Sequence, residues 1–116
     1  MLTIYGIPSC DSCRNARKWL TEHGQEHRFH DLRTDGLDLE MLERWAQALE
    51  WDKLLNTRSI TWRKVPEVDR ADLTSRKAMA LMLDEPTLVK RPVLETDEIV
   101  VVGFSPDSYK KLFDEN

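Results

Sequence analysis

Cys10 and Cys13 are the only cysteines in the chain, and they form a Cys-Asp-Ser-Cys motif. The motif lies where a short apolar run, Leu2 to Tyr5, ends and a helical pattern begins that extends to Leu20. A helix N-terminus presents free backbone N–H groups and the positive end of the helix dipole, and both stabilise a thiolate. The position of the pair therefore predicts thiol redox chemistry.

The spacing of the two cysteines suggests a different role for each. Two thiols separated by two residues on the first turn of a helix can close a small disulfide ring, and the N-terminal sulfur is the more exposed. We predict Cys10 as the nucleophile that forms a mixed disulfide with an oxidised substrate, and Cys13 as the resolving thiol. Arg14 is expected to favour the thiolate, whereas Arg17 and Lys18 fit a solvated helix face as well as a binding role.

A zinc site is the alternative chemistry, because His27 and His30 follow the cysteines at a spacing that loosely resembles a zinc finger. The gap between these histidines is too short for that pattern, and residues 27–32 alternate like a strand. The helix also begins at the cysteines, where a finger has a hairpin. We therefore predict no metal site and expect His23, His27 and His30 at surface or half-buried positions.

The composition is that of a single folded domain spanning residues 1–116, with 41% hydrophobic and 33% charged residues. We find no secretory signal and no apolar run near the roughly 20 residues that span a bilayer. Two cysteines without a signal favour the cytoplasm, where a lasting structural disulfide is not expected. The net charge of −4 argues against direct binding of nucleic acid or of an anionic membrane.

The hydrophobic pattern predicts an α/β fold: a strand–helix–strand unit, a helical middle, and then two strands and a helix. Strands are expected at 2–5, 27–32, 93–95 and 99–102. One helix is expected directly after the cysteines, and further helices at 39–49, 51–55, 78–83 and 87–90. A last helix is expected with Ser105 as N-cap and Pro106 as its first residue. From Thr57 to Asp69 the hydrophobic pattern is poor. This order of elements predicts a mixed four-stranded sheet, βαβ then ββα, with an inserted helical segment at about 38–90. The position of the Cys-x-x-Cys motif after the first strand suits a thioredoxin-like arrangement.

Arg91 and Pro92 precede the third predicted strand. In a thioredoxin-like arrangement Pro92 would stand close to the cysteines with a cis peptide bond; an ordinary trans proline is the alternative. Arg91 would bind a carboxylate or oxyanion through both arms of its guanidinium, which suits glutathione, a phosphate-like oxyanion or a sulfenate near Cys10. A surface arginine beside Lys90 is the alternative. We predict Arg91, Arg14 and Ser12 as the substrate- or anion-binding residues.

Five short motifs are spread over essentially the whole chain: Gly-Ile-Pro-Ser-Cys at 6–10, Arg-Asn-Ala-Arg at 14–17, Leu-Leu-Asn-Thr-Arg at 54–58, Lys-Arg-Pro-Val at 90–93 and Val-Gly-Phe-Ser-Pro at 102–106. Their order and spacing resemble the arsenate reductase (ArsC)-like family, most closely its Spx and YffB branches. The resemblance implies a thioredoxin-like fold with an inserted helical segment. It also implies Cys10 as the catalytic cysteine and Arg91 as an anion-binding arginine before a cis Pro92.

The chain departs from the arsenate reductases of that family, which hold the oxyanion with three arginines. Asn56 stands where the resemblance places the first arginine, with Arg58 nearby as a substitute, and Phe104 stands where it places the last. Only Arg91 survives, so several charge-assisted hydrogen bonds of roughly 1.5–3 kcal/mol each would be missing. We expect little or no arsenate turnover.

Two functions from different classes remain. We favour a glutathione-dependent thiol–disulfide oxidoreductase that binds no cofactor, uses glutathione as co-substrate and acts on glutathione mixed disulfides or protein disulfides. The alternative is an Spx-like redox-sensing transcriptional regulator that binds the RNA polymerase α subunit. The basic C-terminal tail that Spx proteins carry is missing before Asn116, which favours the enzyme.

Overall fold

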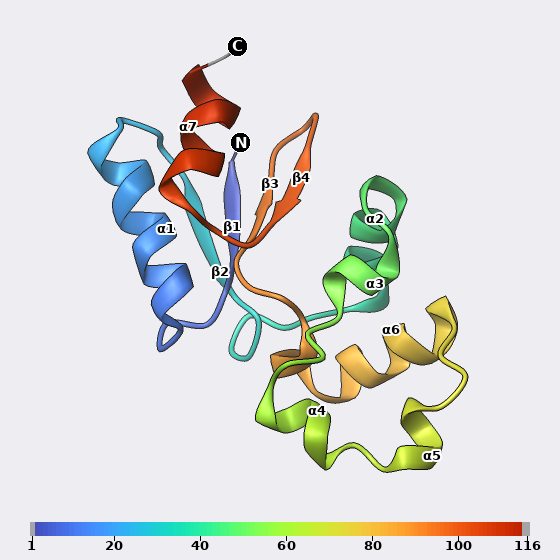
Figure 1. Cartoon of the computed structure of the whole chain (residues 1–116). Coiled ribbons are helices and arrows are strands. Elements are labelled where there is room, and N and C mark those ends of the chain that lie inside the picture. The colour runs from blue at the N-terminus through green and yellow to red at the C-terminus, as the bar shows by residue number, and fades with distance from the viewer. Residues whose placement is uncertain (1, 115–116) are drawn as a thin grey trace. The chain divides into compact units, whose positions relative to one another are not determined.

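The computed structural model of the chain describes residues 2–114 and has two compact units (Figure 1). One unit is formed by the residues up to Asp35 together with those from Arg91 onward, and the other is formed by Gly36–Lys90. The helical segment that we predicted as an insertion falls within this second unit. The assignment of the chain to a single domain stays a prediction.

The first unit contains a four-stranded sheet in the order β2-β1-β3-β4. Its central strand β1 pairs in parallel with β2 and antiparallel with β3, which in turn pairs antiparallel with β4. Ile4 on β1 faces Phe29 on β2 and Leu94 on β3. The strands are β1 (Thr3–Gly6), β2 (Arg28–Asp31), β3 (Val93–Glu95) and β4 (Val100–Val102). The predicted mixed sheet with βαβ followed by ββα is therefore confirmed.

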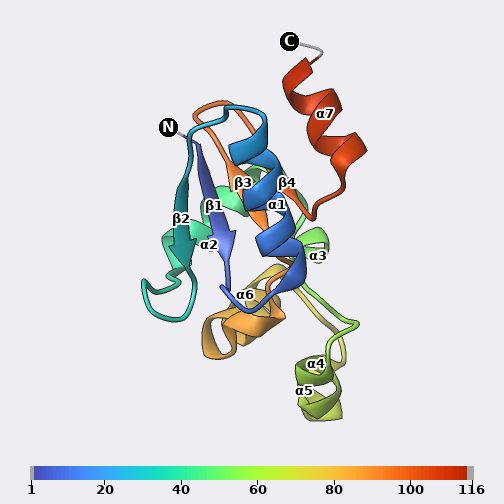
Figure 2. The same cartoon turned by 90° about the vertical axis from the view of Figure 1, so that its left-hand side faces the viewer.

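Helices α1 (Asp11–Glu22) and α7 (Pro106–Asp114) belong to the same unit (Figure 2). They close over the sheet through a core cluster that takes side chains from β1, α1, β3 and α7: Ile4, Ala16, Trp19, Leu20, Leu94 and Tyr109. All of these are fully buried except Trp19, which is 8% exposed. This core holds α1 against the sheet. The cysteines at the start of α1 therefore lie at the same end of the sheet as the end of β1 and the start of β3, which Arg91 precedes.

Local sequence signals determine where α1 ends and where α7 begins. Helix α1 ends where Gly24 adopts a left-handed φ of 68°, and the Gln25 N–H donates to the Leu20 carbonyl over 2.8 Å. Helix α7 begins as the sequence predicts, because the Ser105 Oγ accepts from the Ser108 N–H at 3.0 Å and Pro106 is the first helical residue.

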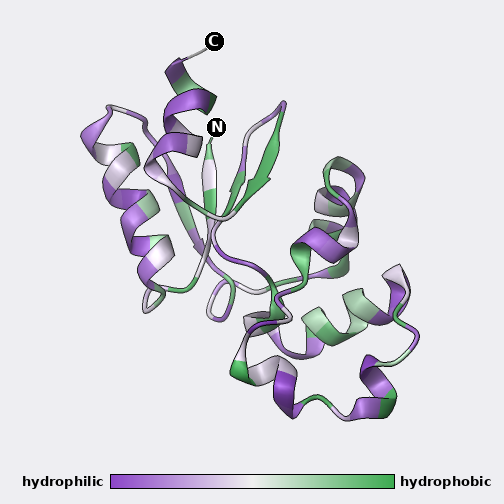
Figure 3. Ribbon diagram, in the orientation of Figure 1, coloured by the Kyte–Doolittle hydropathy of each residue, from purple (hydrophilic) through white to green (hydrophobic). Residues whose placement is uncertain are grey.

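The second unit is helical and has its own core. Its elements are α2 (Leu39–Ala48), α3 (Trp51–Leu54), α4 (Ile60–Lys64), α5 (Glu67–Arg70), α6 (Ser75–Asp84) and the 3-10 helix η1 (Pro86–Leu88). Trp45 is fully buried, as are Leu42, Leu54 and Met82. Figure 3 shows α6 as mostly hydrophobic, whereas α1 in the first unit is hydrophilic along much of its length.

The segment from Thr57 to Asp69, where the sequence pattern is poor, contains α4 and most of α5. Both helices are shorter than two turns and bury none of their own residues, so they leave no apolar period in the sequence. The cap of α4 is local, with the Ser59 side chain accepting from the Trp62 N–H. The other predicted elements occur within a few residues of their expected bounds. Among residues 2–114, no helix is long and apolar enough to cross a bilayer.

Candidate active site

Cys10 is the N-cap residue of α1, at the end of the loop that leaves β1. Its backbone is extended, with φ −80° and ψ 123°, and its N–H donates to the Ile7 carbonyl at 3.1 Å. Its own carbonyl accepts the first helical hydrogen bond, from the Arg14 N–H at 3.0 Å. The thiol is half-buried and lies beside the free N–H groups of the first turn, where a thiolate is stabilised.

Cys13 lies in the first turn of α1 and has no exposed surface. Its sulfur packs against Gly6, the last residue of β1: a Cβ added to Gly6 would overlap the Cys13 Sγ and lie 3.3 Å from its Cβ. Glycine is needed at this position because of the close approach of the sulfur. The buried thiol is therefore sealed between β1 and the inner face of α1.

The two thiols differ in acidity although they share one helical turn. Burial by itself raises the pKa of Cys10, but the N–H and thiol of Cys13 and the guanidinium of Arg91 together bring that pKa below its ordinary value. Burial raises the pKa of Cys13 to about 12, against a weaker opposing effect of the Ile7 backbone, and the neighbouring Cys10 thiolate adds to the rise. At neutral pH, Cys10 is the better nucleophile and Cys13 is the proton-bearing partner.

Arg91 reaches Cys10 because of the sheet register. Strands β1 and β3 are antiparallel, and Tyr5 near the end of β1 pairs with Val93 at the start of β3. The residues that follow β1 and those that precede β3 therefore lie at the same end of the sheet. The Arg91–Pro92 peptide bond is cis, Pro92 is buried, and the Arg91 guanidinium hydrogen-bonds the Cys10 sulfur.

Arg14 and Ser12 are exposed on the first turn of α1. The Arg14 guanidinium forms an ion pair with Asp11, and both side chains are largely exposed. The groups that lower the Cys10 pKa are Cys13 and Arg91. The binding roles of Arg14 and Ser12 therefore stay predictions.

The positions where arsenate reductases would place further arginines have other contacts here. Phe104 packs edge-on against Tyr109, with ring centres 4.7 Å apart. Asn56 belongs to the second unit, where its side-chain oxygen accepts from the Arg58 N–H at 3.1 Å. Neither Phe104 nor Asn56 supplies a positive charge for an oxyanion.

The histidines that suggested the zinc alternative are engaged elsewhere. His27 Nδ1 donates to the Gln25 carbonyl at 3.1 Å, and the His30 ring lies 4.9 Å from that of Tyr5. His23 is exposed and stacks on Trp19. Within residues 2–114, no group of three or more His, Cys, Asp or Glu side chains is placed to hold a metal ion.

Two residues of this region are not evident from the sequence as parts of the site. Gly6 makes room for the Cys13 sulfur, as described above. Tyr109 on the last helix is fully buried, and its hydroxyl has no hydrogen-bond partner among the described residues. Burial and the charge of Cys13 raise the pKa of Tyr109. Only three-dimensional packing brings these residues toward the cysteines, so no local sequence signal marks them.

A Cys-x-x-Cys at the helix after the first strand, with a cis proline before the antiparallel third strand, defines a thioredoxin-like protein. Comparison with known proteins narrows this class. Residues 5–112 match the ArsC family, and the chain belongs to that family.

Three similar proteins illustrate the range of the family. A solved structure of the YffB protein is 44% identical with a TM-score of 0.90, and the match covers 94% of this chain and 96% of that one. An arsenate reductase (ArsC) related protein from Brucella melitensis is 46% identical with a TM-score of 0.78, covering 97% and 93%. The global transcriptional regulator Spx of Listeria innocua is 31% identical, covering 96% of this chain and 86% of its own. The predicted resemblance to the ArsC-like family and its Spx and YffB branches is therefore confirmed.

Proposed function

We propose that the protein is a thiol–disulfide oxidoreductase in which Cys10 attacks and Cys13 resolves. The observation that carries this proposal is the difference between the two thiols. Cys10 is half-buried, hydrogen-bonded to Arg91 and lowered in pKa, whereas Cys13 is sealed and has a pKa of about 12. In a thiol pair of this kind, one sulfur can attack an external disulfide, and the other stays protonated until it resolves the mixed disulfide.

The reaction proceeds in two displacements. The Cys10 thiolate attacks one sulfur of the substrate disulfide, the substrate S–S bond breaks, and the departing thiolate takes up a proton. Cys13 then loses its proton and attacks the Cys10 sulfur, which releases the second substrate thiol and forms the Cys10–Cys13 disulfide. Two electrons have passed from the protein to the substrate. Two glutathione molecules return the disulfide to the dithiol and become glutathione disulfide, so glutathione is the co-substrate in the reducing cytoplasm.

Arg91 has two roles in this scheme. Its guanidinium stabilises the Cys10 thiolate, and its planar fork suits a carboxylate of glutathione or of a substrate peptide. Arsenate fits less well, because Phe104 and Asn56 occupy positions where the reductases of this family would add positive charge. We therefore propose disulfides, rather than arsenate, as the substrates.

A turnover assay tests this proposal. A glutathionylated peptide is reduced with glutathione, and glutathione disulfide is measured through glutathione reductase and NADPH. We expect turnover by the wild type, none by Cys10→Ser, and one glutathione or peptide bound covalently to Cys10 in Cys13→Ser, seen by mass spectrometry. Arg63→Gln, an exposed substitution on α4, is the matched control and should keep full activity. The absence of turnover with glutathionylated peptides and protein disulfides would contradict the proposal, and robust glutathione-coupled arsenate reduction would contradict its substrate class.

A redox-sensing regulator is the second candidate, favoured by the similarity to Spx over 96% of this chain. In this case the Cys10–Cys13 disulfide would be a switch, and the partner would be the RNA polymerase α subunit. A pull-down with the C-terminal domain of that subunit, in reduced and oxidised protein, separates the two candidates. Binding that changes with oxidation, without disulfide turnover, would favour the regulator.

A further inference from the structure

The exposed face of α1 carries a row of positive charge that begins at the nucleophile. Cys10, Arg14, Lys18 and Thr21 follow one another at intervals of three or four residues, with Arg17 beside Lys18, so they share one side of the helix. The side chains of Arg14 and Lys18 are 61% and 75% exposed. This concentration of positive charge stands out in a chain whose net charge is −4.

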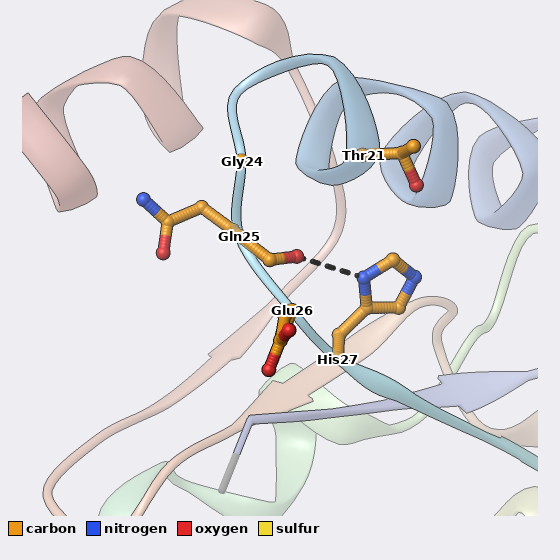
Figure 4. Close-up of a pocket in the computed structure, with 5 residues that line it drawn as sticks. All are labelled: Thr21, Gly24, Gln25, Glu26 and His27. Atoms are coloured by element: carbon orange, nitrogen blue, oxygen red, sulfur yellow. Dashed lines mark hydrogen bonds between the residues drawn. The ribbon is translucent and has the colours of Figure 1, made fainter.

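A groove runs beside this row, between α1 and the chain that leads into β2. Its first part has a volume of about 430 Å³ and is lined by Arg14, Arg17, Lys18, Thr21, Glu22 and His27. Its second part, about 580 Å³, shares Thr21 and His27 and continues along Gly24, Gln25 and Glu26 (Figure 4). We call these two parts together the α1 groove.

Arg17 and Lys18 are the cationic groups of the α1 groove that can meet an incoming anion, since Arg14 pairs with Asp11. Two carboxylates, those of Glu22 and Glu26, also line the groove. The Arg17 guanidinium lies 4.2 Å from the centre of the Phe29 ring, which holds its direction, and within residues 2–114 it makes no ion pair. Lys18 is 3.9 Å from Glu22, an exposed pair that contributes little. Because His27 Nδ1 donates to the Gln25 carbonyl (Figure 4), the Nε2 of the neutral ring carries a lone pair and can accept a hydrogen bond from a backbone N–H of a bound segment.

We propose that the α1 groove binds an extended acidic segment of the protein whose cysteine becomes joined to Cys10. This inference rests on the proposed oxidoreductase function and names its substrate class. A helix rises about 1.5 Å per residue, so Arg14 and Lys18 lie roughly 6 and 12 Å along α1 from Cys10. An extended chain advances about 3.3 Å per residue. Acidic side chains about two to four positions from the substrate cysteine therefore match the positive row.

The length of the α1 groove favours a protein segment over glutathione. Glutathione has a single residue on each side of its cysteine, and the match to Lys18 needs about four extended residues on one side. The groove also continues beyond Lys18 toward Gly24. Glutathione would reach Arg91 and the first positive charge, whereas a protein chain would follow the whole row.

Two matched peptides test the α1 groove. Each has one cysteine, activated as a mixed disulfide with thionitrobenzoate, and carries either glutamate or glutamine at the second, third and fourth positions after the cysteine. Thionitrobenzoate is the better leaving group, so Cys10 attacks the peptide sulfur and the coloured thiol is released. We expect the reduced wild type to react about two- to tenfold faster with the glutamate peptide at low salt, and the preference to fade at high salt.

Charge variants assign this preference to the groove. Arg17→Gln with Lys18→Gln should make the rates on the glutamate and glutamine peptides equal, and Arg17→Glu with Lys18→Glu should favour a lysine peptide. Arg63→Gln, on α4, should keep the wild-type preference. Equal rates on both peptides in the wild type, or a preference that survives Arg17→Gln with Lys18→Gln, would overturn the inference and leave the oxidoreductase intact.

A binding experiment separates a failure of the groove from a failure of the proposed function. If neither peptide reacts with Cys10, the oxidoreductase proposal fails. The groove is then tested with peptides in which serine replaces the cysteine, by fluorescence anisotropy. Salt-sensitive binding of the glutamate peptide that is lost in the Arg17→Gln, Lys18→Gln variant would support the groove, and equal binding of both peptides would overturn it.

Discussion

The two faces of α1 give opposite properties to two sulfurs on the same helical turn. On the exposed face, Cys10 is half-buried and begins a row of charged residues; on the inner face, Cys13 has no exposed surface and is followed by the fully buried Ala16 and Leu20. Both residues lie at the N-terminal end of the same helix and of its dipole. Nevertheless the pKa of Cys10 is lowered and that of Cys13 is raised to about 12.

The difference shows that a helix N-terminus does not set thiol reactivity by itself. The dipole contributes about 0.3–1 kcal/mol at an exposed site, which corresponds to less than one pKa unit. Loss of solvation at a buried thiolate is larger, and no positive side chain hydrogen-bonds Cys13 as Arg91 does Cys10. The deeper burial of Cys13, together with the hydrogen bonds that Cys13 and Arg91 make to Cys10, therefore decides which of the two cysteines attacks first.

The largest expected effect is on alkylation of the reduced protein. Only the thiolate reacts, so the rate at each cysteine rises with pH through its own pKa. Because the pKa of Cys10 is below its ordinary value and that of Cys13 is about 12, we expect Cys10 to react at least about 100-fold faster near neutral pH. Rates resolved by mass spectrometry at each pH would measure this ratio.

Arg91→Gln sharpens the same experiment. It removes the positive charge that lowers the Cys10 pKa, so the Cys10 profile should move to higher pH while Cys13 remains slow. Arg63→Gln should leave both profiles in place. Equal alkylation of the two cysteines in the wild type would contradict the contrast between the faces.

The second effect concerns the space behind the inner face. Gly6→Ala places a Cβ where the Cys13 sulfur lies, and we expect a loss of about 1–3 kcal/mol in the free energy of unfolding. Urea denaturation would measure it. Cys13→Ala in the same chain removes the overlapping sulfur, so the double variant should lose less than the sum of the two single variants. Strict additivity would show that Gly6 does not make room for the thiol.

The smallest effect is at Tyr109, whose hydroxyl is buried without a hydrogen-bond partner among the described residues. Tyr109→Phe removes this polar group and keeps the ring contacts with Phe104 and Trp19. We expect a gain of about 1 kcal/mol in the free energy of unfolding, measured by urea denaturation of the reduced protein. A loss of stability would instead indicate that the hydroxyl is bonded in solution.

Local patterns made much of the fold predictable. Apolar runs and the alternation at 27–32 indicated the strands, and Ser105 with Pro106 indicated the start of α7. Helices α4 and α5 were not predicted because caps, rather than a buried apolar face, determine their few turns. A sequence without an apolar period gives no signal for such helices.

The candidate site was predictable in part for a similar reason. The cysteine pair and Arg91 lie in recognisable motifs, and the family resemblance implied the cis bond at Pro92, which the dipeptide alone does not predict. The approach of Gly6 to Cys13 and the burial of the Tyr109 hydroxyl are products of packing between distant segments. The residues next to Gly6 and Tyr109 in the sequence give no signal that predicts this packing.

The burial of Cys13 also limits how copies of this chain can be linked to one another. The chain has two cysteines, and only the sulfur of Cys10 reaches solvent in the folded state. Each folded chain is therefore monovalent toward other thiols and can hold a single external disulfide at a time. Oxidation that joins folded copies must stop at a pair, because a joined chain has no second accessible sulfur with which to extend a polymer.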